Sequence, residues 1–124
     1  MLAEAKRPAT ALRRRTLFVE ATAIIEAEYD ARVALDDVAR RVATSRRQLQ
    51  RAFAEAGETS FRAYLQRVRM DRAAELLRDG RVPVNVVAGA VGYRQAAQFA
   101  KAFRRHHGAP PSSFRGTVPE RLAA

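Results

Sequence analysis

Apolar side chains along the chain recur with the period of α-helices, and no segment alternates between apolar and polar residues as a strand does. Leu17, Phe18, Ala21, Ile24 and Ile25 form one stripe, which predicts a helix of roughly four turns ending near residues 29–30. Further stripes predict helices over about 35–42, 45–56, 60–78, 83–91 and 95–107, with a last turn at 112–115. We therefore expect an all-α fold of about seven helices.

Residues at the ends of these segments also favour helices. Ser45 and Gln48 have the spacing of a capping box, in which each residue bonds the other's backbone N–H. Gly57 and Gly108 stand where a glycine commonly ends a helix, and Pro83 fits the first position of one. Valines and a glycine in segment 83–91 favour a strand by propensity, but this segment repeats an earlier helix, so we assign it as helical.

The repeat has a period of about fifty residues. Apolar positions 35, 38, 39 and 42 recur as 84, 87, 88 and 91, and positions 49 and 53 recur as 99 and 103. Each copy predicts a short helix, a tight turn and a longer basic helix. This is the helix-turn-helix pattern, whose second helix enters the major groove of DNA. Two matched copies make a stronger signal than either copy alone.

Composition narrows the class of protein. The 124 residues suffice for one domain, or for two very small ones that share a core, and 48% of them are hydrophobic. The sequence contains no apolar run long enough to span a membrane, and its start lacks the apolar region of a secretory signal. The absence of cysteine excludes disulfides, cysteine-based zinc sites and thiol nucleophiles. We expect a soluble, cytoplasmic, nucleoid-associated domain.

The net charge is strongly positive, and the placement of the basic residues indicates that the chain binds a polyanion. The formal net charge is +10, and 21 of the 23 basic residues are arginine. Codon usage in a GC-rich genome also explains the arginine excess, but it does not explain where the charges fall. Residues 38–54 contain five arginines and residues 80–119 six cations, without any acid in either segment. Two acid-free basic segments suggest two contact surfaces on one nucleic acid.

The chain resembles the AraC/XylS family of bacterial transcription regulators from about residue 17 to residue 115. The resemblance rests on LDDVARRVATSRRQLQRAFAEAGETSFRAYLQRVRMDRAAELL and, more specifically, on VVAGAVGYRQAAQFAKAFRRHHGAPPSSFR. It implies two homeodomain-like helix-turn-helix subdomains, at about 35–56 and 83–107, joined by a linker helix at about 60–78. A helix of that length spans roughly 28 Å, which suits recognition helices in successive major grooves about one duplex turn apart. We expect the domain to cover 17–116, between a flexible basic tail at 1–14 and a tail at 117–124.

The first recognition helix offers Arg46, Arg47, Gln50 and Arg51 on the face that Leu49 and Phe53 do not occupy. The resemblance implies that the positions of Arg47, Gln50 and Arg51 reach base edges. Arginine binds guanine and glutamine binds adenine through paired hydrogen bonds. We assign Arg46 to phosphate, and phosphate contact alone is the alternative for the other three.

The second recognition helix departs from the family pattern. Its groove-facing positions are Ala96, Ala97, Ala100 and Lys101, so three of the four offer only methyl groups, for example to thymine. Arg94 stands where a capping residue is usual. Gln95 and Gln98 are the alternative polar readers, and Arg104 and Arg105 complete the basic face.

Other functions are less well supported. His106 and His107 could suggest a metal site, but adjacent helical residues point apart, so we expect a solvated or phosphate-facing helix end. We expect no cofactor, no metal and no small-molecule domain in this chain. We also expect no enzymatic activity, because DNA-alkyl repair proteins with this module use cysteine and this sequence has none. The alternative function is a non-specific nucleoid or RNA-binding protein. RNA polymerase stays open as a second partner, and the operator, the regulated genes, the direction of regulation and any inducer cannot be predicted.

Overall fold

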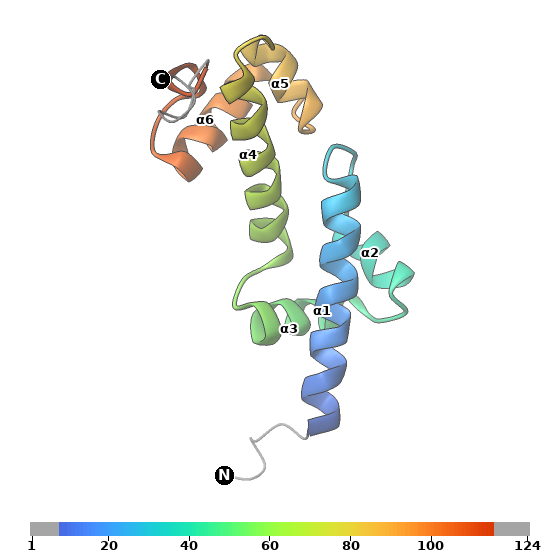
Figure 1. Cartoon of the computed structure of the whole chain (residues 1–124). Coiled ribbons are helices and arrows are strands. Elements are labelled where there is room, and N and C mark those ends of the chain that lie inside the picture. Colours follow the sequence, from blue (N-terminus) through green and yellow to red (C-terminus); the bar gives the residue numbers. More distant parts are fainter. Residues whose placement is uncertain (1–7, 116–124) are drawn as a thin grey trace. The chain divides into compact units, whose positions relative to one another are not determined.

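The computed structural model describes residues 8–115, and every regular element in that range is helical (Figure 1). The elements are α1 (Pro8–Glu28), α2 (Leu35–Arg41), α3 (Arg46–Gly57), α4 (Phe61–Asp79), α5 (Val84–Ala90), α6 (Ala96–His107) and the 3-10 turn η2 (Pro111–Ser113). The predicted all-α fold of about seven helical elements is confirmed. Within residues 8–115, no helix combines the length and the apolar character needed to cross a membrane.

The helices form two compact units, and α4 contributes to both. Within the described residues, the first unit comprises 8–28 and 33–65, and the second comprises 29–32 and 66–115. In the first unit, α1 packs on α2 and α3. The fully buried ring of Phe53 meets the edges or faces of Phe18, Phe61 and Tyr64, with ring centroids 5.1–6.1 Å away. Such edge-to-face pairs favour one defined packing of the core.

The second unit packs α5 and α6 around the C-terminal part of α4. Its core comprises Met70, Ala73, Ala74 and Leu77 of α4 with Val87, Ala88, Val91, Phe99, Ala102 and Phe103. Segment 29–32 is fixed to α4 by Arg69, which donates from Nε to Tyr29 O (2.8 Å) and from Nη2 to Ala31 O (2.9 Å). Partial burial of this guanidinium lowers the pKa of Arg69. The carbonyl oxygens compensate for part of that lost hydration.

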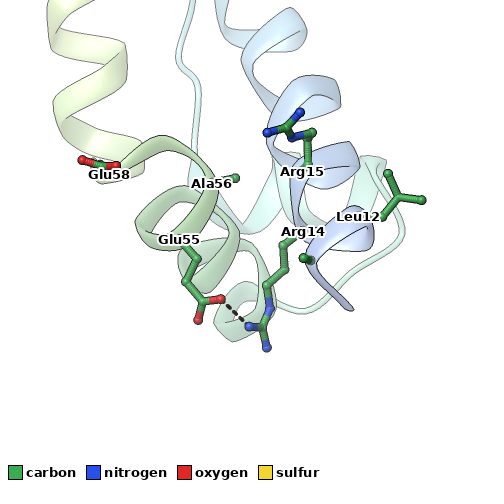
Figure 2. A pocket seen from close by; sticks show the side chains of 7 residues that line it. Leu12, Arg14, Arg15, Glu55, Ala56 and Glu58 are labelled. Atoms are coloured by element: carbon green, nitrogen blue, oxygen red, sulfur yellow. Dashed lines mark hydrogen bonds and ion pairs between the residues drawn. The ribbon is translucent and has the colours of Figure 1, made fainter. Parts of the chain in front are cut away.

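Residues 8–14 belong to α1 and not to an N-terminal tail, so this part of the predicted tail is wrong. Alanine, leucine and arginine propagate a helix well after Pro8, which tolerates a first-turn position. Figure 2 shows the tertiary contact that the sequence did not reveal: Arg14 forms an ion pair with Glu55 of α3. Residues 1–7 and 116–124, including the predicted C-terminal tail, lie outside the described residues.

The helix ends follow the predictions with two exceptions. Ser45 Oγ accepts a hydrogen bond from the backbone N–H of Gln48 at 3.1 Å, which is one of the two bonds of the predicted capping box. Pro83 is the N-cap of α5 instead of its first residue. Gly57 is helical, and Glu58 takes the left-handed conformation that ends α3, with φ of 51°. The predicted role of Gly57 as a helix stop is therefore wrong, and its role lies in packing.

Candidate nucleic-acid interface

The turns between paired helices have the same backbone geometry in both repeats. Ala43 has a positive φ of 59° after α2, and Gly92 has one of 96° after α5. The next N–H bonds back to the first helix in each case, from Thr44 to Ala39 O (2.9 Å) and from Tyr93 to Ala88 O (2.8 Å). A left-handed residue at this point reverses the chain tightly. Both repeats are therefore helix-turn-helix motifs in structure as well as in sequence.

The α3 helix buries one face and exposes the predicted DNA-binding residues on the other. Leu49, Ala52 and Phe53 are buried, at 0% exposure. The exposed residues include Arg46, Arg47, Gln50 and Arg51. The structure thus brings together the four residues selected from the sequence on one accessible surface of α3.

Arginines of the first unit divide into paired and unpaired groups. Arg41 binds Glu28 through both guanidinium nitrogens, at 2.8 and 2.6 Å, and Arg40 pairs with Asp37. On α3, Arg46 lies 3.4 Å from Asp36. The side chains of Arg47 and Arg51 form no hydrogen bond or ion pair with another residue in the described range. Two cations without an internal counter-ion are available to an external anion.

The α6 helix presents a different surface. Phe99, Ala102 and Phe103 are its buried residues. Positions that match the four exposed residues of α3 carry Ala96, Ala97, Ala100 and Lys101, all exposed except the half-buried Ala100. Gln95 is the N-cap, and its side chain makes no capping hydrogen bond. The exposed polar residues at or near this helix are Arg94, Gln95, Gln98, Lys101, Arg104 and Arg105.

A shallow hollow beside α3 contains a basic residue that the sequence analysis did not select. The hollow measures about 400 Å³ and is lined by Arg46 and Gln50 of α3 and by Arg62 in the first turn of α4. Ser60 caps this helix, its Oγ accepting from the N–H of Ala63 at 3.0 Å. The sequence signal that could have identified Arg62 is its position, two residues after the helix-capping Ser60. Only the fold brings Arg62 and Arg46 to the same hollow.

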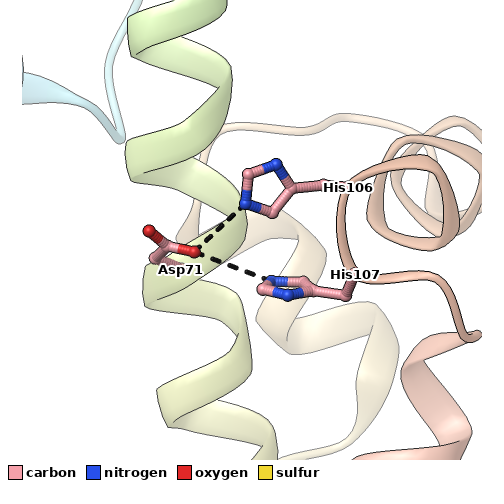
Figure 3. Close-up of side chains that lie close together, drawn as sticks. All are labelled: Asp71, His106 and His107. Atoms are coloured by element: carbon pink, nitrogen blue, oxygen red, sulfur yellow. Dashed lines mark hydrogen bonds and ion pairs between the residues drawn. The ribbon is translucent and has the colours of Figure 1, made fainter.

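The expected divergence of His106 and His107 is wrong. Figure 3 shows both imidazoles directed at Asp71 of α4. His106 Nε2 lies 3.2 Å from Asp71 Oδ1, and His107 Nε2 lies 2.9 Å from the Met70 carbonyl oxygen and 3.9 Å from Asp71 Oδ1. The two side chains converge at the last turn of α6, where Gly108 ends the helix with φ of 81°.

Comparisons with known proteins agree with this geometry. The helix-turn-helix domain family matches residues 38–117. The chain is 33% identical over 100 residues to the HTH-type transcriptional regulator GbdR of Pseudomonas aeruginosa, covering 81% of this chain and 27% of GbdR. The relatives are named as transcriptional regulators, which does not favour an enzyme. The chain spans about a quarter to a third of the length of the curated relatives that it matches first.

Solved structures give the same result. An AraC-type transcriptional regulator from Chromobacterium violaceum superposes with a TM-score of 0.77 at 29% identity, covering 82% of this chain and 90% of that one. The DNA-binding domain of AdpA, solved in complex with a target DNA, gives a TM-score of 0.76 at 25% identity, covering 86% of this chain and 96% of that one. The similarity to these two proteins therefore extends over both repeats.

Proposed function

The chain belongs to the AraC/XylS family of helix-turn-helix transcription regulators. On this premise we propose that its two repeats have different roles in binding double-stranded DNA. The α3 helix reads bases with Arg47, Gln50 and Arg51. The α6 helix supplies mainly phosphate contacts and methyl contacts. The observation that carries this proposal is the contrast at matched positions, where α3 has hydrogen-bond donors and α6 has two exposed alanines and one half-buried alanine.

The unpaired state of the arginines supports base reading by α3. Arg47 and Arg51 are one helical turn apart, so both side chains project from the same face. Because neither has an internal acid partner within the described residues, binding a base breaks no ion pair of the protein. Each paired contact of an arginine with guanine, or of a glutamine with adenine, contributes about 1–3 kcal/mol of discrimination.

Phosphate contacts are assigned to cations beside the reading residues. Arg46 and Arg62 border the same hollow, and the N-terminal N–H groups of α4 add a favourable dipole for an anion. On the second repeat, Arg94, Lys101, Arg104 and Arg105 are exposed, and none of their side chains has a hydrogen-bonded or ion-paired partner within residues 8–115. These cations supply affinity that is independent of base sequence. RNA polymerase is not needed for any of these contacts.

Selection of binding sites from random duplex DNA, with the purified chain, tests this division directly. We expect one half-site with strong preferences for guanine or adenine and a second, degenerate half-site that tolerates A·T pairs. Sequence preference in the second half would come partly from DNA deformability. Equal information content in both halves would contradict the proposal and would assign base reading to Gln95 or Gln98. Enrichment of no sequence would support non-specific binding instead.

A further inference from the structure

We propose that Asp71, His106 and His107 form a zinc(II) site within the second unit. The three side chains offer one carboxylate oxygen and two imidazole nitrogens, and these ligand atoms lie within 4.8 Å of one another. Imidazole nitrogen and carboxylate oxygen are common zinc ligands. Three protein ligands leave a fourth position for water, as in open zinc sites.

Distances between the ligand atoms are close to those that zinc requires. Zinc–nitrogen and zinc–oxygen bonds of about 2.0–2.2 Å in a tetrahedron place ligand atoms about 3.3 Å apart. In the structure, Asp71 Oδ1 is 3.2 Å from His106 Nε2 and 3.9 Å from His107 Nε2. His107 Nε2 must therefore approach Asp71 Oδ1 by about half an ångström, within the range of ordinary side-chain motion, and all three ligand atoms already lie within 4.8 Å of one another.

Packing holds the two imidazoles in place. The ring of His107 lies 4.5 Å from that of Phe103 and 5.3 Å from that of Phe114, measured between centroids. The ring of His106 stands nearly perpendicular to His107, at 4.6 Å and 89°. The His side chains keep 28% and 17% of their surface exposed, so a hydrated ion can reach them. Packed ligands need little ordering when they bind a metal.

Two hydrogen bonds must be exchanged on binding, because His106 Nε2 also donates to Asp71 Oδ1, at 3.2 Å. His107 Nε2 donates to the carbonyl of Met70 at 2.9 Å, and a nitrogen that carries a proton cannot bind a metal. Binding therefore requires the proton to reside on Nδ1 of both rings and the ring of His107 to turn from Met70 towards Asp71. The bound ion would tie the end of α6 to α4 and so stiffen the recognition helix of the second repeat.

Zinc titration of the tag-free, chelator-treated chain tests the site. The sequence contains two histidines and no cysteine, so every imidazole-bound metal must use at least one of these two residues. We expect calorimetry to give one Zn²⁺ per chain, and NMR to show both histidine ring signals shifting together until one equivalent is added. Failure to saturate at one equivalent, or a shift of one ring alone, would overturn the proposal. Neither measurement involves DNA, so the result is independent of the function proposed above.

One variant of each proposed ligand tests its own contribution to zinc binding. Asp71→Asn and His106→Ala should each weaken zinc binding by roughly 10–100-fold, the range already seen for loss of groups that only orient ligands. His107→Phe keeps a ring against Phe103 and Phe114 and should have the same effect, with helix content checked by circular dichroism. Glu20→Gln, which removes an exposed acid of α1, should leave the affinity unchanged. Unchanged affinity in Asp71→Asn would exclude the proposed coordination.

Discussion

The ring of Phe18 on α1 occupies the space that a side chain at Gly57 on α3 would need. A Cβ built on Gly57 would lie 2.3 Å from Phe18 Cε1 and 2.5 Å from Phe18 Cζ. Phe18 is in turn in edge-to-face contact with Phe53 and Tyr64. Gly57 therefore permits the close approach of α1 and α3 on which the aromatic core of the first unit depends.

Gly57→Ala should destabilise the first unit, because the Phe18 ring must move or the helices must separate. Overpacking of this kind costs about 1–3 kcal/mol. Gly89→Ala in α5 is the matched control: its Cβ meets nothing within 4 Å, so it should stabilise its helix by up to about 1 kcal/mol. Urea unfolding followed by circular dichroism measures both. A neutral Gly57→Ala variant would show that moving Phe18 costs no more than the alanine gains in helix propensity.

The two glycines also show what sequence reasoning could and could not reach. Periodicity and the repeat were sufficient to predict the order of helices, because the buried faces of α3 and α6 carry the same pattern of apolar residues. The role of Gly57 depends on Phe18, 39 positions earlier, and a local rule for helix ends cannot include it. On α4, Met70, Ala73 and Leu77 are fully buried, whereas Leu76 is only partly buried. The partners that decide which face of α4 is covered lie elsewhere in the chain.

In the candidate site, too, features with a local sequence pattern could be predicted and features that depend on contacts between helices could not. Exposure of Arg47, Gln50 and Arg51 could be predicted from the spacing of Leu49 and Phe53 alone. Neither the pairing of Arg46 with Asp36 nor the convergence of two histidines on Asp71 has a local signal, because each depends on packing between helices. Such contacts between helices determine which cations are paired with an acid and which remain available to DNA.

Arg51→Ala should weaken binding to the selected DNA site by about 1–3 kcal/mol and change non-specific binding less. The reason is that a base contact carries sequence information, whereas a phosphate contact does not. Arg46→Ala should lower both affinities alike. Arg13→Ala on α1, an exposed arginine outside the two recognition helices, controls for lost charge. Fluorescence anisotropy on specific and scrambled duplexes measures all three, and an equal loss for Arg51→Ala on both would make this residue a phosphate contact.

Binding should depend strongly on salt, because many cations lie on the proposed surfaces. If six to ten of them meet phosphates, affinity should fall roughly 10³–10⁵-fold between 50 and 200 mM salt. The same anisotropy titration at several salt concentrations gives the slope of log K against log salt. A slope shallower than about −3 would be too small for two DNA-contacting surfaces.

The Glu28–Arg41 pair should make the contact between α1 and α2 sensitive to acid. The hydrogen bond from Arg41 lowers the pKa of Glu28 below its ordinary value of 4.5 in the folded chain. Its stabilising contribution is therefore complete above the unfolded-state pKa and is lost as the pH falls through the folded-state pKa. NMR titration of the Glu28 carboxyl should give a midpoint below 4.5. In Glu28→Gln, stability should fall at neutral pH and depend less on pH in the acid range.

Ala97→Arg should give α6 a base-reading residue that it now lacks. Position 97 in α6 matches position 47 in α3, and Ala97 is exposed, so a longer side chain fits without repacking. An arginine there can bind guanine through two hydrogen bonds, and we expect a new guanine preference in the degenerate half-site of about 1–3 kcal/mol. Site selection with this variant measures the gain directly.

The added charge of Ala97→Arg needs its own control. Ala90→Arg places the same charge on the exposed surface of α5, at the position that matches Arg41 of α2. It should raise affinity for every duplex alike, because an arginine without a base edge opposite it can reach only phosphates. If Ala97→Arg behaved in the same way, α6 would not be seated in a major groove with position 97 towards the bases. A guanine preference confined to Ala97→Arg would instead show that the alanines of α6 are what leave its half-site degenerate.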